Sequence, residues 1–224
     1  MSGGSNSQNE TSDFLVKIAG SKFTQSEPQG IQFVDVQDHV DMVGSAEIQF
    51  GGKASVDWSS LKIGSDVEVE IGGESSHKVF KGYIAAVRHQ FTRGQNTISV
   101  RALCPLCKLQ ASRKTRIWED SKDSDAVKAV IGDSPVSSGT VDATAEKRKY
   151  IMQRNESDLR FIRRMAARNG YLVTSDDGKV NVAKPQYSGA GIELPKNKII
   201  SLNYTFTDRL VPPKVTVYGW DYVA

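Results

Sequence analysis

The sequence has few of the residues that metal-binding proteins carry. It contains two cysteines and three histidines in 224 residues, whereas a zinc site needs about four such ligands. Cys104 and Cys107 enclose a Pro-Leu dipeptide, and no histidine stands at ligand spacing from them. We therefore expect no metal and no other cofactor, and we interpret both cysteines as small apolar residues of a core turn.

Catalytic motifs are also missing. The sequence holds no G-x-S-x-G, no H-E-x-x-H and no P-loop, the motifs that commonly mark a nucleophile, a metalloprotease helix or a phosphate site. Glu156 and Asp158 could pair as a general acid and base. Their place at the start of a predicted helix favours capping and interaction with the helix dipole instead. We expect that the protein is not an enzyme.

Long apolar runs are absent from the printed sequence. No stretch approaches the roughly 20 apolar residues that span a bilayer, and the first residues lack the charged-then-apolar order of a signal peptide. Residues 1–12 consist almost wholly of small and polar residues, which predicts a disordered tail. We expect a protein that is made and folds in the cytoplasm, without a membrane anchor.

Strands are predicted between residues 13 and 102. Apolar and polar residues alternate there with period two, and Gly, Pro, Ser and Asp interrupt the alternation. No helical period intervenes, so this region predicts an antiparallel barrel or sandwich. The expected strands are Phe14–Ile18, Ile31–Val36, Ala46–Phe50, Val67–Ile71, Lys78–Phe91 and Asn96–Ala102.

The period changes beyond the second cysteine. Ala126, Val127, Val130 and Ile131 fall on one face of a short helix that ends before Gly132. Residues 133–145 are small and polar and predict a loop. Further strands are expected at Tyr150–Gln153, Tyr171–Thr174, Lys179–Val182, Ile199–Phe206 and Lys214–Trp220, with a hairpin turn at 176–178.

The most strongly marked element runs from Asn155 to Gly170. Asn155 is predicted to be its N-cap, and Asp158 stands where it could close a capping box. Leu159 and Phe161 belong to its apolar side, and Gly170 suits the left-handed turn that ends a helix. We expect an amphipathic helix of about 14 residues, roughly 21 Å long.

The residues around this helix resemble a known family. The run from Gln153 to Arg164, followed by Asn169-Gly170-Tyr171, is similar to the Q-x-x-E-S-D-x-x-F-x-x-R…G-Y segment of phage late control protein D and VgrG hub proteins. Arg113–Trp118 with the later Ser-Asp pair, and Val215–Asp221, resemble two weaker segments of that family. The motif residues are Asn155, Glu156, Ser157, Asp158, Leu159, Phe161, Arg164, Gly170, Tyr171, Trp220 and Asp221.

This resemblance implies a structural baseplate part of a phage tail, a type VI secretion system or another contractile injection system. Its members form a trimeric ring that adapts the six-fold tail tube to the three-fold spike. We accordingly expect a homotrimer that is assembled in the bacterial cytoplasm and built into a virion or injection particle. Its expected partners are the tail tube protein above, a spike or tip protein (or the chain's own C-terminal spike) below, and baseplate wedge components.

The charge is nearly balanced, with 29 basic and 26 acidic side chains. A basic stretch runs from Lys147 to Arg168, but few aromatic residues are interleaved with it, so we expect no sequence-specific nucleic-acid binding. We expect this charge to line the channel of the assembly or to pair with the acidic segment Asp66–Glu70 of a neighbouring subunit.

The expected fold class is mainly β, of the α+β type: an antiparallel β-barrel, then a small α+β subdomain with a capped helix and hairpins. Its parts are a tail (1–12), a barrel hub domain (13–104), a helix and polar loop (105–145) and an α+β subdomain (146–224) that leads into a further β domain missing here. Two other function classes remain open. A stand-alone barrel that binds carbohydrate or peptide would be a monomer, and a spike-associated hydrolase would carry a pocket of groups with perturbed pKa values.

Overall fold

The computed structural model of the protein describes residues 14–24, 30–51, 61–72, 77–93, 95–186 and 216. The chain divides into two compact units, Met1–Pro185 and Gln186–Ala224. The expected tail at 1–12 and the expected strand Ile199–Phe206 lie outside the described residues. So does Lys214–Trp220, apart from the exposed Thr216.

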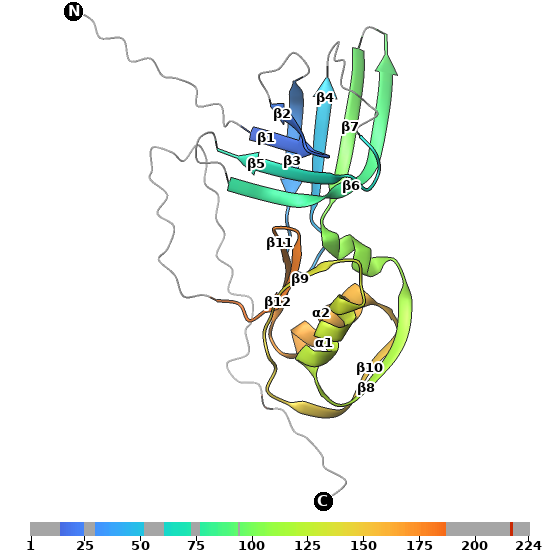
Figure 1. The fold of residues 1–224 in the computed structure, drawn as a ribbon, viewed down its shortest axis with the longest axis vertical. Helices are drawn as coiled ribbons and strands as arrows, with labels where there is room; N and C mark the ends of the chain where they lie inside the picture. The colour runs from blue at the N-terminus through green and yellow to red at the C-terminus, as the bar shows by residue number, and fades with distance from the viewer. Residues whose placement is uncertain are drawn as a thin grey trace, which may run out of the picture. The chain divides into compact units, whose positions relative to one another are not determined.

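A seven-stranded antiparallel sheet forms the first half of the larger unit (Figure 1). Its hydrogen-bonded order is β2-β1-β5-β6-β7-β4-β3. The strands are β1 (Phe14–Ile18), β2 (Ser21–Thr24), β3 (Ile31–Gln37), β4 (Ser45–Gly51), β5 (Asp66–Ile71), β6 (His77–Thr92) and β7 (Gln95–Leu103). All strands that the alternation predicted in this region are present. β2 was missed because its four residues hold a single large apolar side chain, Phe23.

The sheet wraps around its own core because β6 bends. β6 pairs with β5 through its first half and with β7 through its second, and the register shifts between Ile84 and Ala86. A Cβ added at Gly82 would lie 2.3 Å from the carbonyl oxygen of Leu103, so the two strands approach where only glycine fits. Figure 1 shows β1 and β5 crossing over β3 and β4 as a result.

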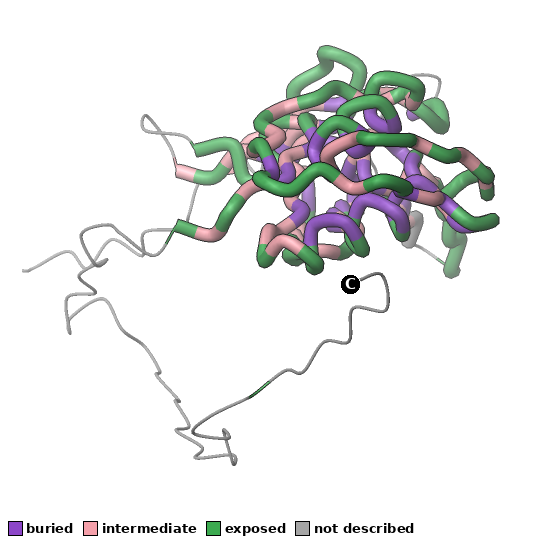
Figure 2. Tube along the Cα trace, turned by 90° about the horizontal axis from the view of Figure 1, so that it is seen from below, coloured by how far each residue is buried: buried purple, intermediate pink, exposed green. Residues whose placement is uncertain are grey.

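The interior of the sheet is filled by alternate residues of its strands, as the period-two pattern predicts. Figure 2 shows the buried residues gathered inside, with exposed residues along the turns. At the ends of the sheet, Phe23 of β2 meets Phe50 of β4 edge to face, with 5.3 Å between ring centroids. In the described part of the chain no ladder joins β2 to β3, so the barrel-like sheet is completed there by side-chain packing.

A smaller α+β layer follows the sheet. Its elements are the 3-10 helix η2 (Pro105–Gln110), β8 (Arg113–Lys122), α1 (Asp123–Gly132), β9 (Ser137–Val141), β10 (Lys147–Ser157), α2 (Asp158–Arg168), β11 (Leu172–Asp176) and β12 (Lys179–Ala183). β8 and β10 form an antiparallel ribbon, and β11, β12 and β9 form a second sheet. The helices α1 and α2 pack together between ribbon and sheet (Figure 1). The predicted mainly β, α+β class is confirmed.

Two boundaries differ from the sequence prediction. The helix expected at Asn155–Gly170 begins at Asp158 and ends at Arg168, and its N-cap is Ser157, whose Oγ accepts a hydrogen bond from the Arg160 amide at 3.3 Å. Asn155 instead occupies a bulge of β10 with φ +42°, a left-handed conformation that Asn tolerates better than most residues. The prediction of Asn155 as the cap was therefore wrong.

The segment 133–145 was predicted to be a loop, but it contains β9. The sequence of this strand, S-S-G-T-V, has no alternation of apolar residues, and it pairs parallel to β12, more than 35 residues away. Such a strand is specified by its partner rather than by its own pattern. No described helix is long and apolar enough to cross a membrane.

Candidate functional site: the β10–α2 segment and its ion pairs

The predicted motif residues gather where β10 meets α2. Glu156 and Ser157 end the strand, and Asp158, Leu159, Phe161 and Arg164 belong to the helix. Gly170 follows the helix with φ +67°, as predicted for its terminal turn. The Tyr171 hydroxyl donates to the carbonyl of Ala143 at 2.9 Å. Trp220 and Asp221 lie outside the described residues.

The apolar motif residues hold α2 against the ribbon. Leu159 is 2% exposed and Phe161 is fully buried. The Phe161 ring stacks on Trp118 of β8 with 5.1 Å between centroids, and the Arg164 guanidinium lies 5.4 Å from the centroid of the same ring. Stacking and cation–π contacts each add about 0.5–1.5 kcal/mol to the burial of such a ring.

Asp158 is buried and surrounded by donors. Its carboxylate accepts hydrogen bonds from Lys114 Nζ at 2.7 Å, from Gln153 Nε2 at 2.8 Å and from Ser134 Oγ at 3.1 Å. Burial raises the pKa of Asp158, but the bonds from Lys114 and Gln153 outweigh it, so this pKa lies below its ordinary value. Asp158 thus stays charged and joins α2 to both ribbon strands.

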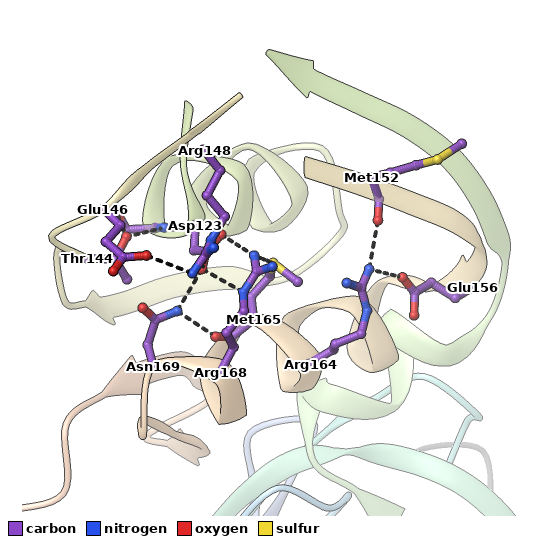
Figure 3. A network of polar contacts seen from close by, with 11 residues as sticks. Asp123, Thr144, Glu146, Arg148, Met152, Glu156, Arg164, Met165, Arg168 and Asn169 are labelled. Carbon is purple, nitrogen blue, oxygen red and sulfur yellow. Dashed lines mark hydrogen bonds and ion pairs between the residues drawn. The ribbon is translucent and has the colours of Figure 1, made fainter. Parts of the chain in front are cut away.

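Glu156 and Arg164 form a second ion pair, on the ribbon side of α2, in which only the carboxylate is buried. Arg164 donates to Glu156 Oε1 at 2.5 Å and to the Met152 carbonyl at 2.7 Å (Figure 3). The side chain of Glu156 is 10% exposed, whereas that of Arg164 is 45% exposed. Arg164 therefore reaches from the helix to the backbone of β10 while part of its guanidinium stays in water.

A third cluster of polar contacts, which no sequence pattern predicts, centres on Asp123 at the start of α1. Arg168 contacts this carboxylate through Nε at 3.0 Å and through a second, shorter bond, and Asn169 Nδ2 donates to it at 2.9 Å (Figure 3). Arg148 of β10 lies 3.4 Å away. These partners stand 25 to 46 positions from Asp123 in the sequence, so spacing alone could not reveal them.

The buried carboxylates of this region join neighbouring elements to one another. A general acid near neutral pH needs a carboxyl with a raised pKa, whereas that of Asp158 is lowered by its partners. Asp123 and Glu156 also contact basic side chains. No group of three or more His, Cys, Asp or Glu suited to a metal ion occurs among the described residues.

Cys104 lies beside a polar cavity of about 240 Å³ between β6 and the β11–β12 hairpin, whereas Cys107 is half-buried within η2. Lys78, Lys81 and Asp177 line its wall, and Lys78 pairs with Asp177 at 2.7 Å. Cys104 is 4% exposed, and burial raises the pKa of its thiol, which disfavours the reactive thiolate. Both cysteines are free, and Cys104 precedes η2 as a residue of the expected core turn.

The basic stretch from Lys147 to Arg168 separates into two sets. Arg148, Arg164 and Arg168 turn inward to buried carboxylates. Arg164 and Arg168 nevertheless stay partly exposed. The second set, Lys147, Lys149, Arg154, Arg160 and Arg163, is exposed as well, and of these Arg160 lies 4.0 Å from Glu156. The acidic segment expected to pair with this stretch across subunits is already engaged within the chain: Glu68 contacts Lys81 at 3.1 Å and Glu70 contacts Lys17 at 2.5 Å.

Sequence comparison gives one family match. Residues 8–224 match the model of the Alg8 N-terminal domain family. That family is not the late control protein D family to which the motif was likened. A comparison with curated proteins found no match.

Solved structures of tail proteins share the fold. A 43 kDa tail protein of prophage MuSo2 from Shewanella oneidensis has a TM-score of 0.68 at 19% identity, covering 82% of this chain and 56% of that one. A tail protein of Neisseria meningitidis has a TM-score of 0.58 at 18% identity, covering 80% and 52%. The type VI secretion component c3393 of Escherichia coli, described as similar to the T4 tail proteins gp27 and gp5, has a TM-score of 0.54 at 19% identity, covering 75% and 47%. The chain spans about half the length of these proteins.

Proposed function

The chain belongs to the Alg8 N-terminal domain family, and from that premise we propose that it is the N-terminal module of a structural baseplate hub in a phage-like contractile injection system. The observation that carries the proposal is the fold that it shares, over three quarters or more of its length, with a prophage tail protein, a second tail protein and a type VI secretion component. The motif likeness to late control protein D and VgrG supports the hub rather than another tail part.

In this proposal three copies form a ring between the tail tube and the spike. A three-fold ring needs a head-to-tail contact in which two different surfaces of each copy meet. The tail tube protein binds above the ring and the spike or tip protein below it, with wedge components at the periphery. The particle is a virion or an injection machine assembled in the bacterial cytoplasm.

The hub has no catalytic function in this proposal. The buried carboxylates of the motif segment and of Asp123 contact cations, and such ion pairs hold the helices and strands in one arrangement. A part that transmits the force of contraction needs that rigidity. A spike-associated hydrolase would need titratable groups shifted toward neutral pH in an open pocket.

Molecular mass in solution tests the proposal directly. Sedimentation equilibrium and native mass spectrometry of the full chain should give three times the chain mass of 24.5 kDa. A monomer at concentrations far above those of assembly would contradict the hub and favour a stand-alone binding module. Release of soluble fragments from purified peptidoglycan would contradict the absence of catalysis.

A further inference from the structure

The outer face of the β8–β10 ribbon is apolar at its centre. Neighbouring residues of a strand point to opposite faces, so Ile117, Tyr150 and Met152 face away from the buried Ile151. Ile117 is 58% exposed and Tyr150 is 61% exposed. Ile117 and Met152 are direct cross-strand partners. Within the described residues each ribbon strand pairs only with the other, so both outer edges are open.

Basic residues lie around this apolar centre. Four exposed cations of the ribbon, Arg113, Lys147, Lys149 and Arg154, form no ion pair among the described residues. Two exposed carboxylates, at positions 119 and 120, accompany them. The net charge of the exposed ribbon is therefore positive. Arg154 alternates onto the same face as Met152, and the ammonium of Lys149 reaches the Tyr150 ring, 5.8 Å from its centroid. We call this surface, built on Ile117, Tyr150, Met152, Lys149 and Arg154, the basic face.

The edge of the large sheet carries a surface of opposite charge. Phe33, Asp35 and Glu47 lie on the outer face of β3 and β4, since Val34 and Ile48 point to the core. Phe33 is 50% exposed. This surface, defined by Phe33, Asp35 and Glu47, is the acidic face.

The two carboxylates of the acidic face are direct cross-strand partners, a placement of like charges that destabilises a sheet. Asp35 accepts a hydrogen bond from Gln37 at 2.8 Å. In the described part of the chain neither carboxylate forms an ion pair, although Arg101 of β7 is the direct cross-strand partner of Glu47 on its other side. A cation supplied from outside would relieve the repulsion between them.

We propose that the basic face binds the acidic face of a second copy of this chain, head to tail. Each face presents an exposed apolar centre beside unpaired charge, and the two signs are opposite, so contact buries Phe33 against Ile117 and Tyr150 while the rims pair. Charge of this kind sets orientation and excludes wrong partners. The inference rests on the proposed hub and names the surfaces that close its ring.

Other pairings of these faces fit less well. Two basic faces in contact would oppose Lys149 and Arg154 to their own copies. The acidic strand β5 is not free, because Glu68 and Glu70 are already bound to lysines of their own chain. Two different faces can also close a ring of three, which a contact of one face with itself cannot do.

Reversal of each face tests the proposal in the full chain. D35K/E47K makes the acidic face positive, and K149E/R154E makes the basic face negative. Each double variant opposes like charges across the contact. Sedimentation should therefore give it a dissociation constant at least about tenfold higher than that of the wild type. The variant with all four substitutions restores opposite signs and should recover the trimer.

A mixture of the two double variants gives a sharper signature. Each variant repels itself but complements the other at both contacts, so the mixture should form assemblies with equal numbers of the two, and no trimer. Lys128→Glu, an exposed residue of α1, is the control and should leave the trimer unchanged. Circular dichroism melts check that every variant is folded.

The outcomes separate the two proposals. If the wild type is a trimer and both charge-reversal variants still form trimers, this interface is wrong but the proposed hub is not contradicted. That holds also if a different acidic protein is then found to bind the ribbon. A folded four-substitution variant that stays monomeric also overturns the interface. A wild-type monomer overturns the proposed hub, and the interface with it.

Discussion

The large sheet and the ribbon with its two helices are held together by different means. The core of the sheet is apolar, with Val16, Ile48, Val67 and Val100 fully buried. The ribbon region buries Asp123, Gln153, Glu156 and Asp158 as well. Apolar packing tolerates exchange of side chains of similar volume, whereas a buried charge requires its partner in place. The sheet thus gains its stability from burial, and the ribbon region is fixed in one geometry.

The largest effect expected in the ribbon region comes from its aromatic contact. Phe161→Ala removes the ring that stacks on Trp118 and leaves a cavity, and should lower the free energy of unfolding by about 3–5 kcal/mol. Urea unfolding followed by tryptophan fluorescence measures it. The matched control is Phe91→Ala, because Phe91 is 75% exposed, and its effect should stay within about 0.5 kcal/mol. Equal unfolding curves for both variants would show that Phe161 is not in the core.

A somewhat smaller effect is expected at the Asp123 pair. Asp123→Ala leaves Arg168 and Asn169 without their acceptor, and should cost about 2–3 kcal/mol, discounted because Arg168 is partly exposed to water. Thermal unfolding of this variant is compared with that of Asp177→Asn, which removes a surface ion pair with Lys78, keeps a residue that tolerates the φ of +44°, and should have a much smaller effect. If both variants unfold alike, the buried network contributes no more than a surface ion pair.

The stability of the ribbon region should depend on pH through Asp158. The folded pKa of Asp158 lies below its ordinary value, so the stability that it contributes is present above the unfolded pKa of about 3.9 and is lost as pH falls through the folded value. Asp158→Asn should therefore destabilise the protein at pH 7, and the difference from wild type should shrink below about pH 4. Urea unfolding at pH 7, 5, 4 and 3 measures this. A constant difference at every pH would show that Asp158 is not the titrating group.

The smallest expected effect is at the cap of α2. Ser157→Ala removes the acceptor for the Arg160 amide and should cost about 1 kcal/mol. Asn155→Gly should cost nothing, because glycine adopts the φ of +42° more readily than asparagine. Thermal melts of the two variants distinguish the observed cap from the one expected at Asn155. A loss of stability in the Asn155 variant with none in the Ser157 variant would show that Asn155 is the N-cap after all.

Sequence patterns alone predict every strand of the large sheet except β2, the apolar faces of both helices and the hairpin at Asp176–Gly178. Each of these follows from a local pattern, because the period of apolar residues and the turn residues act within a few positions. The residues of the motif were also visible, and Glu156, Ser157 and Asp158 do meet at one place.

The tertiary structure decided what those residues do. Whether Asn155 or Ser157 caps α2 depends on the bulge that β8 imposes on β10. Asp123 meets Arg148 and Arg168 because strand pairing and helix packing bring distant segments together. β9 exists because β12 supplies its hydrogen bonds. Long-range pairing of this kind leaves no periodic pattern in the sequence, because the hydrogen-bonding and ion-pair partners of each segment lie in a distant segment.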